Sequence, residues 1–597
     1  MKRYLRFWLE LLWLSWKRYP GQTSALIVCK LLSVVLVAIT ALALRDVVNA
    51  VIDHDPRTAV VAGLVAALAY CAMAHLEGLD TVIIFVLVER IGLLELQPQI
   101  DHDIAAIEGL DHLERAEFLD RVTVVRGAAW GLVFGMWVAV DSVFNMSRLA
   151  VLLVVLGAVN PWLLVLLLFA AAPLWFEQRA QRMVNAAETE TAESFRLQRH
   201  LFNLATEAAT SKEIRTAGAG PECARRQAEA WQDVAKVQLR ARIRGARWQL
   251  AGWLLFTAAF GAGLAAVANG AVSGAGTVGD VVLAITVLIN LRLAVQMTVH
   301  RTAETAGAGR LIDPYLWLRD YVAAESARRK GSQPAPDTLR DGIELDHVSF
   351  TYPGTTRPAL DDVSVRLAAG SVVAVVGEYG SGKTTLVKLL MKFYQPDSGT
   401  ILVDGIDLQD LDANGWRSHA SVIFQDFGRF QTTFGETVGL GDLEHIDDVE
   451  RIEQAVRWAD AQDLVRRLPD GLDTQLGRSL GGVDLSEGQW QKAALARASM
   501  RRRPVLFALD EPTASLDPPS EHAIFKRYMT RARSLAEEAG AIVIVVSHRF
   551  SSVAGADQIL VMDKGRISER GTHDELVAAG GRYAEMYGIH ARAYAIA

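Results

Sequence analysis

A glycine-rich loop carries the clearest chemistry in the sequence. Residues 377–384 read Gly-Glu-Tyr-Gly-Ser-Gly-Lys-Thr, and they lie between the apolar runs 371–376 and 386–390. Glycines at this spacing let backbone N–H groups turn toward phosphate oxygens, while the lysine neutralises charge and the threonine hydroxyl can ligate Mg²⁺. The pattern predicts a strand, a loop and a helix that bind a nucleoside triphosphate with Mg²⁺. The residues expected to contact the nucleotide here are Gly377, Glu378, Tyr379, Gly380, Ser381, Gly382, Lys383, Thr384 and Thr385.

Two further apolar runs end in polar residues of the kind that a nucleotide site needs. The run 505–510 ends in Asp510, which Glu511 follows, and the run 541–546 precedes Ser547 and His548. Because parallel strands present their carboxyl ends at one edge of a sheet, we expect these side chains near the phosphate loop, with Asp510 in the Mg²⁺ shell. For His548 taken alone, an ordinary polar residue after a strand is an equal alternative.

A short run before the second strand narrows the class of ATPase. It consists of Leu485, Ser486, Glu487, Gly488 and Gln489, followed by an apparent helix over 490–500. This run resembles the signature of the ATP-binding cassette (ABC) superfamily, which usually reads Leu-Ser-Gly-Gly-Gln. The resemblance implies a head-to-tail dimer in which Ser486 and Gly488 of one copy contact the γ-phosphate held by Lys383 of the other. A helix N-terminus suits such an anion. Glu487 departs from the pattern and places a carboxylate beside that phosphate, which puts the turnover rate in doubt.

The same resemblance assigns roles to single positions over residues 341–590. Tyr352 is implied to stack on adenine, with a plain hairpin aromatic as the alternative. Thr384, Gln425 and Asp510 are implied to hold Mg²⁺, while Glu511 polarises the attacking water and His548 holds the γ-phosphate. Ser515 and Asp517 belong to a loop implied to cross the dimer interface. These roles match phosphoryl transfer, which depends on positioning and charge neutralisation.

The first half of the sequence is too apolar for a soluble domain. A helix needs about 20 residues to cross a hydrocarbon layer of about 30 Å, and runs such as 149–156 lack the polar face of a helix on the surface of a soluble protein. The fold class expected is a membrane all-α domain of six helices fused to a cytoplasmic α/β P-loop ATPase. The six spans predicted are about 22–44, 59–90, 128–157, 160–178, 247–269 and 279–299.

Domain boundaries follow from changes in composition. We expect an amphipathic interfacial helix over 1–20, a transmembrane domain over 21–310, a linker over 311–340 and an ATP-binding domain over 341–590. The linker contains the polar, turn-rich stretch 328–336. A signal peptide is the alternative for the N-terminus, but Glu10 interrupts its apolar run and no small-residue cleavage site follows.

Basic residues predict the orientation in the membrane. Arginine and lysine are concentrated before the first span and between 179 and 244, whereas the short loops 53–57, 158–161 and 269–279 hold one arginine. By the positive-inside rule, both termini and the ATPase lie in the cytoplasm. The location expected for the protein is the plasma membrane of a bacterial cell.

Six spans followed by one cassette resembles the type I ABC exporter half-transporter, which has the type IV fold. This family needs a second half. A homodimer is favoured because Lys383, Gln425, Asp510, Glu511 and His548 are all present, and Glu487 leaves a heterodimer open. Residues 112–120 and 206–217 lie where the family's coupling helices rest on the cassettes, or they are solvated amphipathic helices.

The substrate is the least determined property. Lys30, Glu77, Asp80, Asp141, Asn145, Arg148 and Arg292 fall within or near the spans, where they either line a path or pair between helices. Residues 425–427 and 488–492 resemble exporters of lantibiotic-type peptides that lack a peptidase domain. The function expected is therefore ATP-driven export of a modified peptide, with drug, lipid or hydrophobic natural-product export as alternatives and a regulatory ATPase as a further one. The net charge of −7 argues against nucleic acid as a partner.

Overall fold

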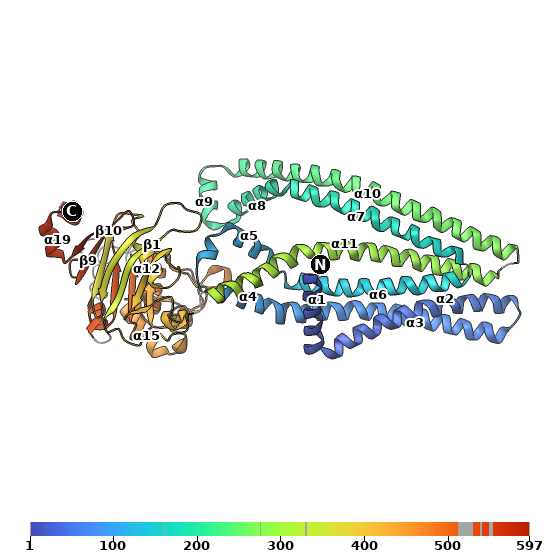
Figure 1. The fold of residues 1–597 in the computed structure, drawn as a ribbon, viewed down its shortest axis with the longest axis horizontal. Helices are drawn as coiled ribbons and strands as arrows, with labels where there is room; N and C mark the ends of the chain where they lie inside the picture. Colours follow the sequence, from blue (N-terminus) through green and yellow to red (C-terminus); the bar gives the residue numbers. More distant parts are fainter. Residues whose placement is uncertain are drawn as a thin grey trace. The chain divides into compact units, whose positions relative to one another are not determined.

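The computed structural model describes residues 2–159, 161–274, 276–328, 331–511, 529–537, 540–547 and 553–595. The predicted site residues His548, Ser515 and Asp517 lie outside these ranges. The chain forms two compact units. Unit 1 comprises Met1–His102 and Arg121–Leu318, and unit 2 comprises Asp103–Asp120 and Arg319–Ala597. Long helices make up unit 1, and unit 2 contains the strands (Figure 1).

Unit 1 is built from long helices. The α2–α3 and α7–α10 pairs pack along each other. Asp55 begins α3 because its carboxylate accepts hydrogen bonds from the backbone N–H groups of Arg57 and Thr58, while Pro56 occupies the first helical position. The helices that lie wholly or partly in unit 1 are α1 (Lys2–Arg18), α2 (Pro20–Ile52), α3 (Pro56–Ile91), α4 (Gln97–Ala105), α5 (Ala116–Val125), α6 (Ala129–Val159), α7 (Leu166–Glu190), α8 (Ala192–Thr206), α9 (Ala208–Thr216), α10 (Gly220–Val272) and α11 (Val278–Arg328).

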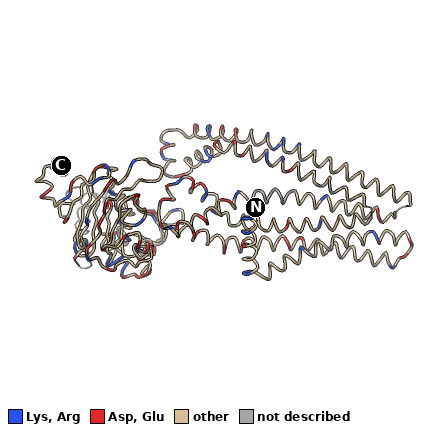
Figure 2. The backbone as a smooth tube through the Cα atoms, in the orientation of Figure 1, with Lys and Arg blue, Asp and Glu red and all other residues tan. Residues whose placement is uncertain are grey.

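Apolar stretches long enough to cross a membrane are found in five helical segments of the described residues. They are Pro20–Ile52, Pro56–Ala105, Ala129–Ala158, Gly220–Val272 and Val278–Thr298. Charged residues are sparse along Pro20–Ile52 and Ala129–Ala158, whereas the first half of Gly220–Val272 carries many of them (Figure 2). The predicted span 160–178 corresponds to a 3-10 turn over Pro161–Val165 and the first half of α7, which is not among the five, so the count of six spans stays a prediction. The helices extend past the predicted spans because hydropathy marks only their apolar part.

The described residues of unit 2 form two sheets. The first is antiparallel, in the order β2-β1-β4-β5, and the second has the order β10-β9-β3-β8-β7-β6 with only β10 antiparallel. The strands are β1 (Gly342–Phe350), β2 (Leu360–Ala368), β3 (Val372–Gly377), β4 (Ser398–Val403), β5 (Ile406–Asp407), β6 (Ala420–Ile423), β7 (Leu506–Asp510), β8 (Ile542–Val546), β9 (Gln558–Asp563) and β10 (Arg566–Gly571).

Burial on both faces explains the continuous apolar runs of β3, β7 and β8. Along β3, Val372 and Ala374 pack into one core while Val373 and Val375 pack into the other, as the alternation of a strand requires. The two cores fix the strand that carries the phosphate loop. The helices around the sheets are α12 (Lys383–Leu390), α13 (Ala413–Ser418), α14 (Phe434–Gly439), α15 (Val449–Trp458), α16 (Gln462–Arg467), α17 (Glu487–Ala498), α19 (His573–Ala579) and α20 (Arg582–Ala595).

The segment 103–120 belongs to unit 2 although helices of unit 1 flank it. Its backbone is held by hydrogen bonds, because the N–H of Leu110 donates to the carbonyl of Phe393 at 3.1 Å and Arg417 donates to the carbonyl of Glu108 at 2.7 Å. The Tyr394 hydroxyl donates to the Glu114 carboxylate. The first predicted coupling segment therefore contacts the ATPase domain, whereas α9, the second, lies in unit 1.

Candidate ATP site

The phosphate loop runs from the end of β3 to the start of α12. Its shape depends on glycine at two positions with φ values in the left-handed region, Gly377 at 151° and Gly382 at 105°. A Cβ atom at Gly377 would lie 2.3 Å from the carbonyl oxygen of Met562, and one at Gly382 would lie 2.6 Å from that of Ala359. Any other residue would therefore displace backbone, which explains the glycine spacing in the sequence.

Lys383 is the cation of the loop. Its Nζ donates hydrogen bonds to the carbonyl oxygens of Gly377 and Glu378, at 3.0 and 2.8 Å. Burial lowers the pKa of Lys383, and the carboxylates of Glu511 and Asp510 oppose that shift. A largely buried ammonium group beside the loop is the charge that a triphosphate needs.

Asp510 ends β7 at the edge of the sheet where β3 ends. The register aligns Asp510 with Val546 of β8, and Val546 with Val375 of β3. Burial raises the pKa of Asp510 to about 6, while the Thr384 hydroxyl and the Lys383 ammonium lower it. Within the described part of the chain, neither carboxylate oxygen meets the geometric criteria for a hydrogen bond. A buried carboxylate in need of partners, close to a hydroxyl, fits a hard cation such as Mg²⁺.

Glu511 and Gln425 follow strand ends that are neighbours in the sheet. Glu511 has φ of 49°, a left-handed conformation that is rare for residues other than glycine, and its N–H donates to the carbonyl of Val546 at 3.1 Å. Gln425 is exposed in the turn after β6, and the register pairs Ile423 of that strand with Leu509. The structure thus brings both predicted residues to the same edge as Asp510.

Tyr352 lies beside the first turn of α12. Its hydroxyl is 3.1 Å from the hydroxyl of Thr385, and Lys388 lies 5.7 Å from the ring centre. The half-buried ring makes edge contacts with Phe350 and Tyr394, at centroid distances of 5.0 and 5.4 Å. The aromatic residue predicted to stack on adenine is therefore next to the phosphate loop.

The signature forms the capped start of α17. The Ser486 hydroxyl accepts a hydrogen bond from the N–H of Gln489, whose side chain accepts one from the N–H of Ser486. Leu485 and Trp490 anchor the turn in the core, while Ser486 and Glu487 are exposed. Among the described contacts, no hydrogen bond or ion pair joins the signature to the phosphate loop of the same chain.

Two arginines that the sequence analysis did not select contact predicted site residues. Arg429 forms an ion pair with Glu487, and Arg582 of α20 lies 2.7 Å from the carboxylate of Glu378 in the phosphate loop. A carboxylate in place of the usual signature glycine was a signal that a compensating cation is needed. Sequence could not select Arg429 for that role, because the chain holds 61 lysines and arginines.

Comparison with known proteins decides the class of this site. Residues 360–514 match the family model described as ABC transporter. The chain contains an ABC transporter domain. Its fold is that of an exporter, because a bacterial Atm1-family ABC exporter with ATP bound superposes with a TM-score of 0.79 at 24% identity, covering 96% of this chain and 99% of the other.

Relatives of this chain include two proteins named ATP-dependent lipid A-core flippase. The one from Pseudomonas fluorescens (strain Pf0-1) is 42% identical over 250 residues, which is 42% of this chain and 40% of the relative. The one from Aromatoleum aromaticum is 36% identical over 330 residues, 52% and 53% of the two chains. The chain thus spans about half or less of the length of these curated relatives. The predicted ABC transporter domain, the predicted fold class apart from the count of six spans, and the resemblance to the fold of an ABC exporter half are confirmed, whereas none of these findings supports the lantibiotic resemblance.

Proposed function

We propose that this chain is one half of a dimeric ABC exporter that uses ATP to move a lipid-like amphiphile across the bacterial plasma membrane. The observation that carries the proposal is an ABC transporter domain in one chain with five apolar helical segments, in an exporter fold. The names of the relatives favour a lipid over the modified peptide expected from sequence. Peptide export and multidrug export are the alternatives, and the experiment below tests them with the lipid.

The residues of the loop bind and position ATP. Backbone N–H groups of 377–384 and the Lys383 ammonium would hold the β- and γ-phosphates, and Tyr352 would stack on adenine. Thr384, Asp510 and Gln425 would hold Mg²⁺, which when bound neutralises phosphate charge. Glu511 orients the attacking water, and His548, outside the described residues, is assigned to the γ-phosphate.

A second copy completes the site. Ser486 and Gly488 lie at the exposed start of α17, where free N–H groups and the helix dipole favour an anion. Such a helix start can contact a γ-phosphate held by Lys383 of another copy. Ser515 and Asp517 are assigned to the loop that crosses this interface. A homodimer needs no other chain to supply these groups.

Arg429 can balance the carboxylate of Glu487, which put the turnover rate in doubt because it would lie beside the γ-phosphate. The two side chains form an ion pair, and about half of each is exposed. The pair cancels the charge that Glu487 would otherwise place beside the γ-phosphate, although salt and water screen it. This arrangement supports turnover by a homodimer.

Coupling and membrane placement follow from the same proposal. The contacts of residues 108–114 with Phe393, Tyr394 and Arg417 carry motion of the ABC domain toward the helices, and α9 is assigned the equivalent contact with the partner.

Helix α1 has exposed Trp13 and Trp16 and ends in two basic residues, which suits the cytoplasmic membrane surface.

Transport into inside-out proteoliposomes tests the proposal. The purified full chain would be supplied with MgATP and a panel of fluorescent lipids, modified peptides and dyes, with Glu511→Gln as the blank. Lipid movement above that blank supports the proposal, whereas peptide movement without lipid movement refutes the assigned substrate. ATP hydrolysis with nothing moved would refute export by this chain alone.

A further inference from the structure

A cavity within unit 1 is lined by charged side chains from the apolar helices. Its volume is 570 Å³, and α2, α3, α6 and α11 contribute residues to its wall. Six of the seven intramembrane polar residues singled out from the sequence line it, and Arg292 does not. Charge in hydrocarbon is costly, so a cluster that faces a cavity indicates a site for a polar group.

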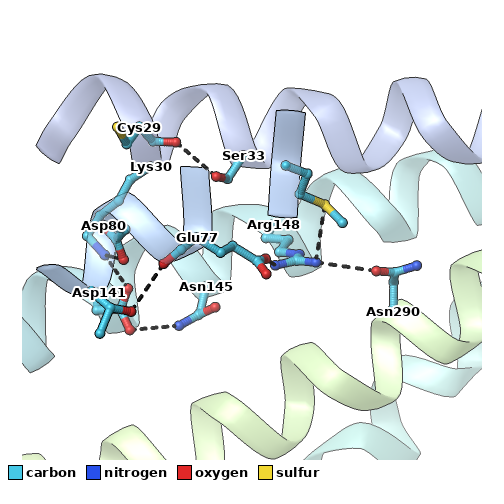
Figure 3. Close-up of polar contacts among 11 residues, drawn as sticks. Cys29, Lys30, Ser33, Glu77, Asp80, Asp141, Asn145, Arg148 and Asn290 are labelled. Atoms are coloured by element: carbon cyan, nitrogen blue, oxygen red, sulfur yellow. Dashed lines mark hydrogen bonds and ion pairs between the residues drawn. The ribbon is translucent and has the colours of Figure 1, made fainter. Parts of the chain in front are cut away.

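One part of the cluster holds a lysine between two carboxylates. Lys30 of α2 is 5% exposed, and its Nζ lies 3.0 Å from Asp80 of α3 and 2.5 Å from Asp141 of α6. Asn145 donates to the other oxygen of Asp141 at 3.3 Å. Figure 3 shows Lys30 of α2, Asp80 of α3 and Asp141 of α6 pointing toward one another, with Asn145 one turn away from Asp141 on α6. One ammonium therefore faces two carboxylates.

The other part of the cluster is balanced. Arg148 of α6 pairs with Glu77 of α3 at 3.0 Å and donates to the amide oxygen of Asn290 at 3.3 Å. Among the described residues that line the cavity, the carboxylates are thus three and the cationic groups two. The excess negative charge belongs to the group of Asp80, Asp141 and Lys30.

A second pocket extends from the same two aspartates into aromatic surroundings. It measures 130 Å³ and is lined by Asp80 and Asp141 together with Phe85, Phe134 and Trp137. Trp137 is fully buried, and its indole N–H has no acceptor among the described residues. Carboxylates beside aromatic rings suit a cationic nitrogen attached to apolar groups, and the indole can donate to an oxygen next to that nitrogen.

We propose that the cavity binds the headgroup of an amphiphile that carries a protonated amine, with the nitrogen at Asp80 and Asp141. This inference rests on the proposed lipid export and specifies its substrate class. A headgroup bearing only negative charge would meet an excess of carboxylates, and like charges that face each other repel. An amine is selected both by attraction to this group and by exclusion of anions.

The test compares fluorescent lipids with identical tails and cationic, zwitterionic or anionic headgroups, moved by the full chain in proteoliposomes with MgATP. We expect the cationic lipid to move about tenfold faster than the anionic one, because of the charge excess. Asp141→Asn should bring this ratio close to one while Asp80 still pairs with Lys30. Asn145→Asp adds a carboxylate and should increase the ratio. The matched control is Asp280→Asn, whose carboxylate pairs with Arg45 at 2.8 Å outside the cavity.

Faster movement of the anionic lipid, or an unchanged ratio in Asp141→Asn, would overturn the assignment. If no lipid moves although ATP is hydrolysed, the proposal of lipid export is refuted. Equilibrium binding of a fluorescent alkylamine to the same protein then tests the amine site on its own. Binding to wild type and Asp280→Asn that is lost in Asp141→Asn supports the amine site. Equal binding in all three proteins contradicts it.

Discussion

Arg582 of the C-terminal helix lies 2.7 Å from Glu378 of the phosphate loop. Both side chains are partly exposed, so Arg582→Ala should change the free energy of unfolding by less than about 1 kcal/mol. It should raise the KM for ATP, because Glu378 then faces the phosphates without its partner. Steady-state ATPase assays measure this, with Arg566→Ala, which removes an exposed pair with Asp361, as the control. An equal KM in the two variants would contradict the prediction.

Glu511→Gln should keep ATP binding and lose turnover. Glutamine preserves the size of the side chain but cannot polarise water as a carboxylate does, so kcat should fall by about 10²- to 10⁴-fold. Equilibrium binding of labelled ATP and phosphate-release assays measure the two properties, and the bound state should persist as a closed dimer on size-exclusion chromatography. Undiminished hydrolysis would remove Glu511 from its assigned role.

Arg429 and Glu487 should behave as a coupled pair. In the proposed dimer, Arg429→Ala would leave the Glu487 carboxylate without its ion pair next to the partner's γ-phosphate, so the KM for ATP should rise several-fold. Adding Glu487→Gly should reverse that increase, since the repelling charge is gone. A double-mutant cycle on KM measures the coupling. Additive effects of the two substitutions would show that Arg429 does not balance Glu487.

Two inactive variants should restore activity when combined. Lys383→Ala disables the loop of its own chain, and Ser486→Ala disables the signature offered to the partner. In a mixed dimer one ATP site keeps both Lys383 and Ser486. We expect ATP hydrolysis from the co-purified mixed dimer, isolated with two different tags, and almost none from either variant alone. A mixed dimer as inactive as its parents would argue against a site shared between copies.

Asp404 should make folding sensitive to acid. Burial alone raises the pKa of Asp404, but N–H donors of Gly342, Arg340 and Asp341 outweigh it and hold the pKa below its ordinary value of 3.8. The ionised form is thus favoured in the folded state, so its stabilisation is present above pH 3.8 and is lost as the pH falls through the folded pKa. Asp404→Asn should lower Tm at neutral pH, and the difference should shrink below pH 3.8. A difference that is constant with pH would contradict this.

Sequence could predict the elements that local patterns encode. The phosphate loop, the buried strands before Asp510 and Ser547, and the signature helix all follow from residue types at fixed spacing. Pairings between distant segments could not be predicted, because they depend on how helices rotate and pack. Lys30 meets Asp80 and Asp141 across three helices, and Arg582 meets Glu378 across 204 residues of chain. The choice between a translocation path and interhelical pairs therefore required the structure.

We propose that ATP hydrolysed by this chain moves a lipid. The most direct measurement is the rate at which a fluorescent lipid changes leaflet in proteoliposomes that contain only this protein, with MgATP added on the side of the ABC domain. We expect the wild-type protein to move the lipid, and we expect this movement to cease in Glu511→Gln and without Mg²⁺, while labelled peptides stay in place. The proposal would be contradicted if the lipid moved at the same rate in Glu511→Gln as in wild type. It would also be contradicted if wild-type protein hydrolysed ATP without moving the lipid.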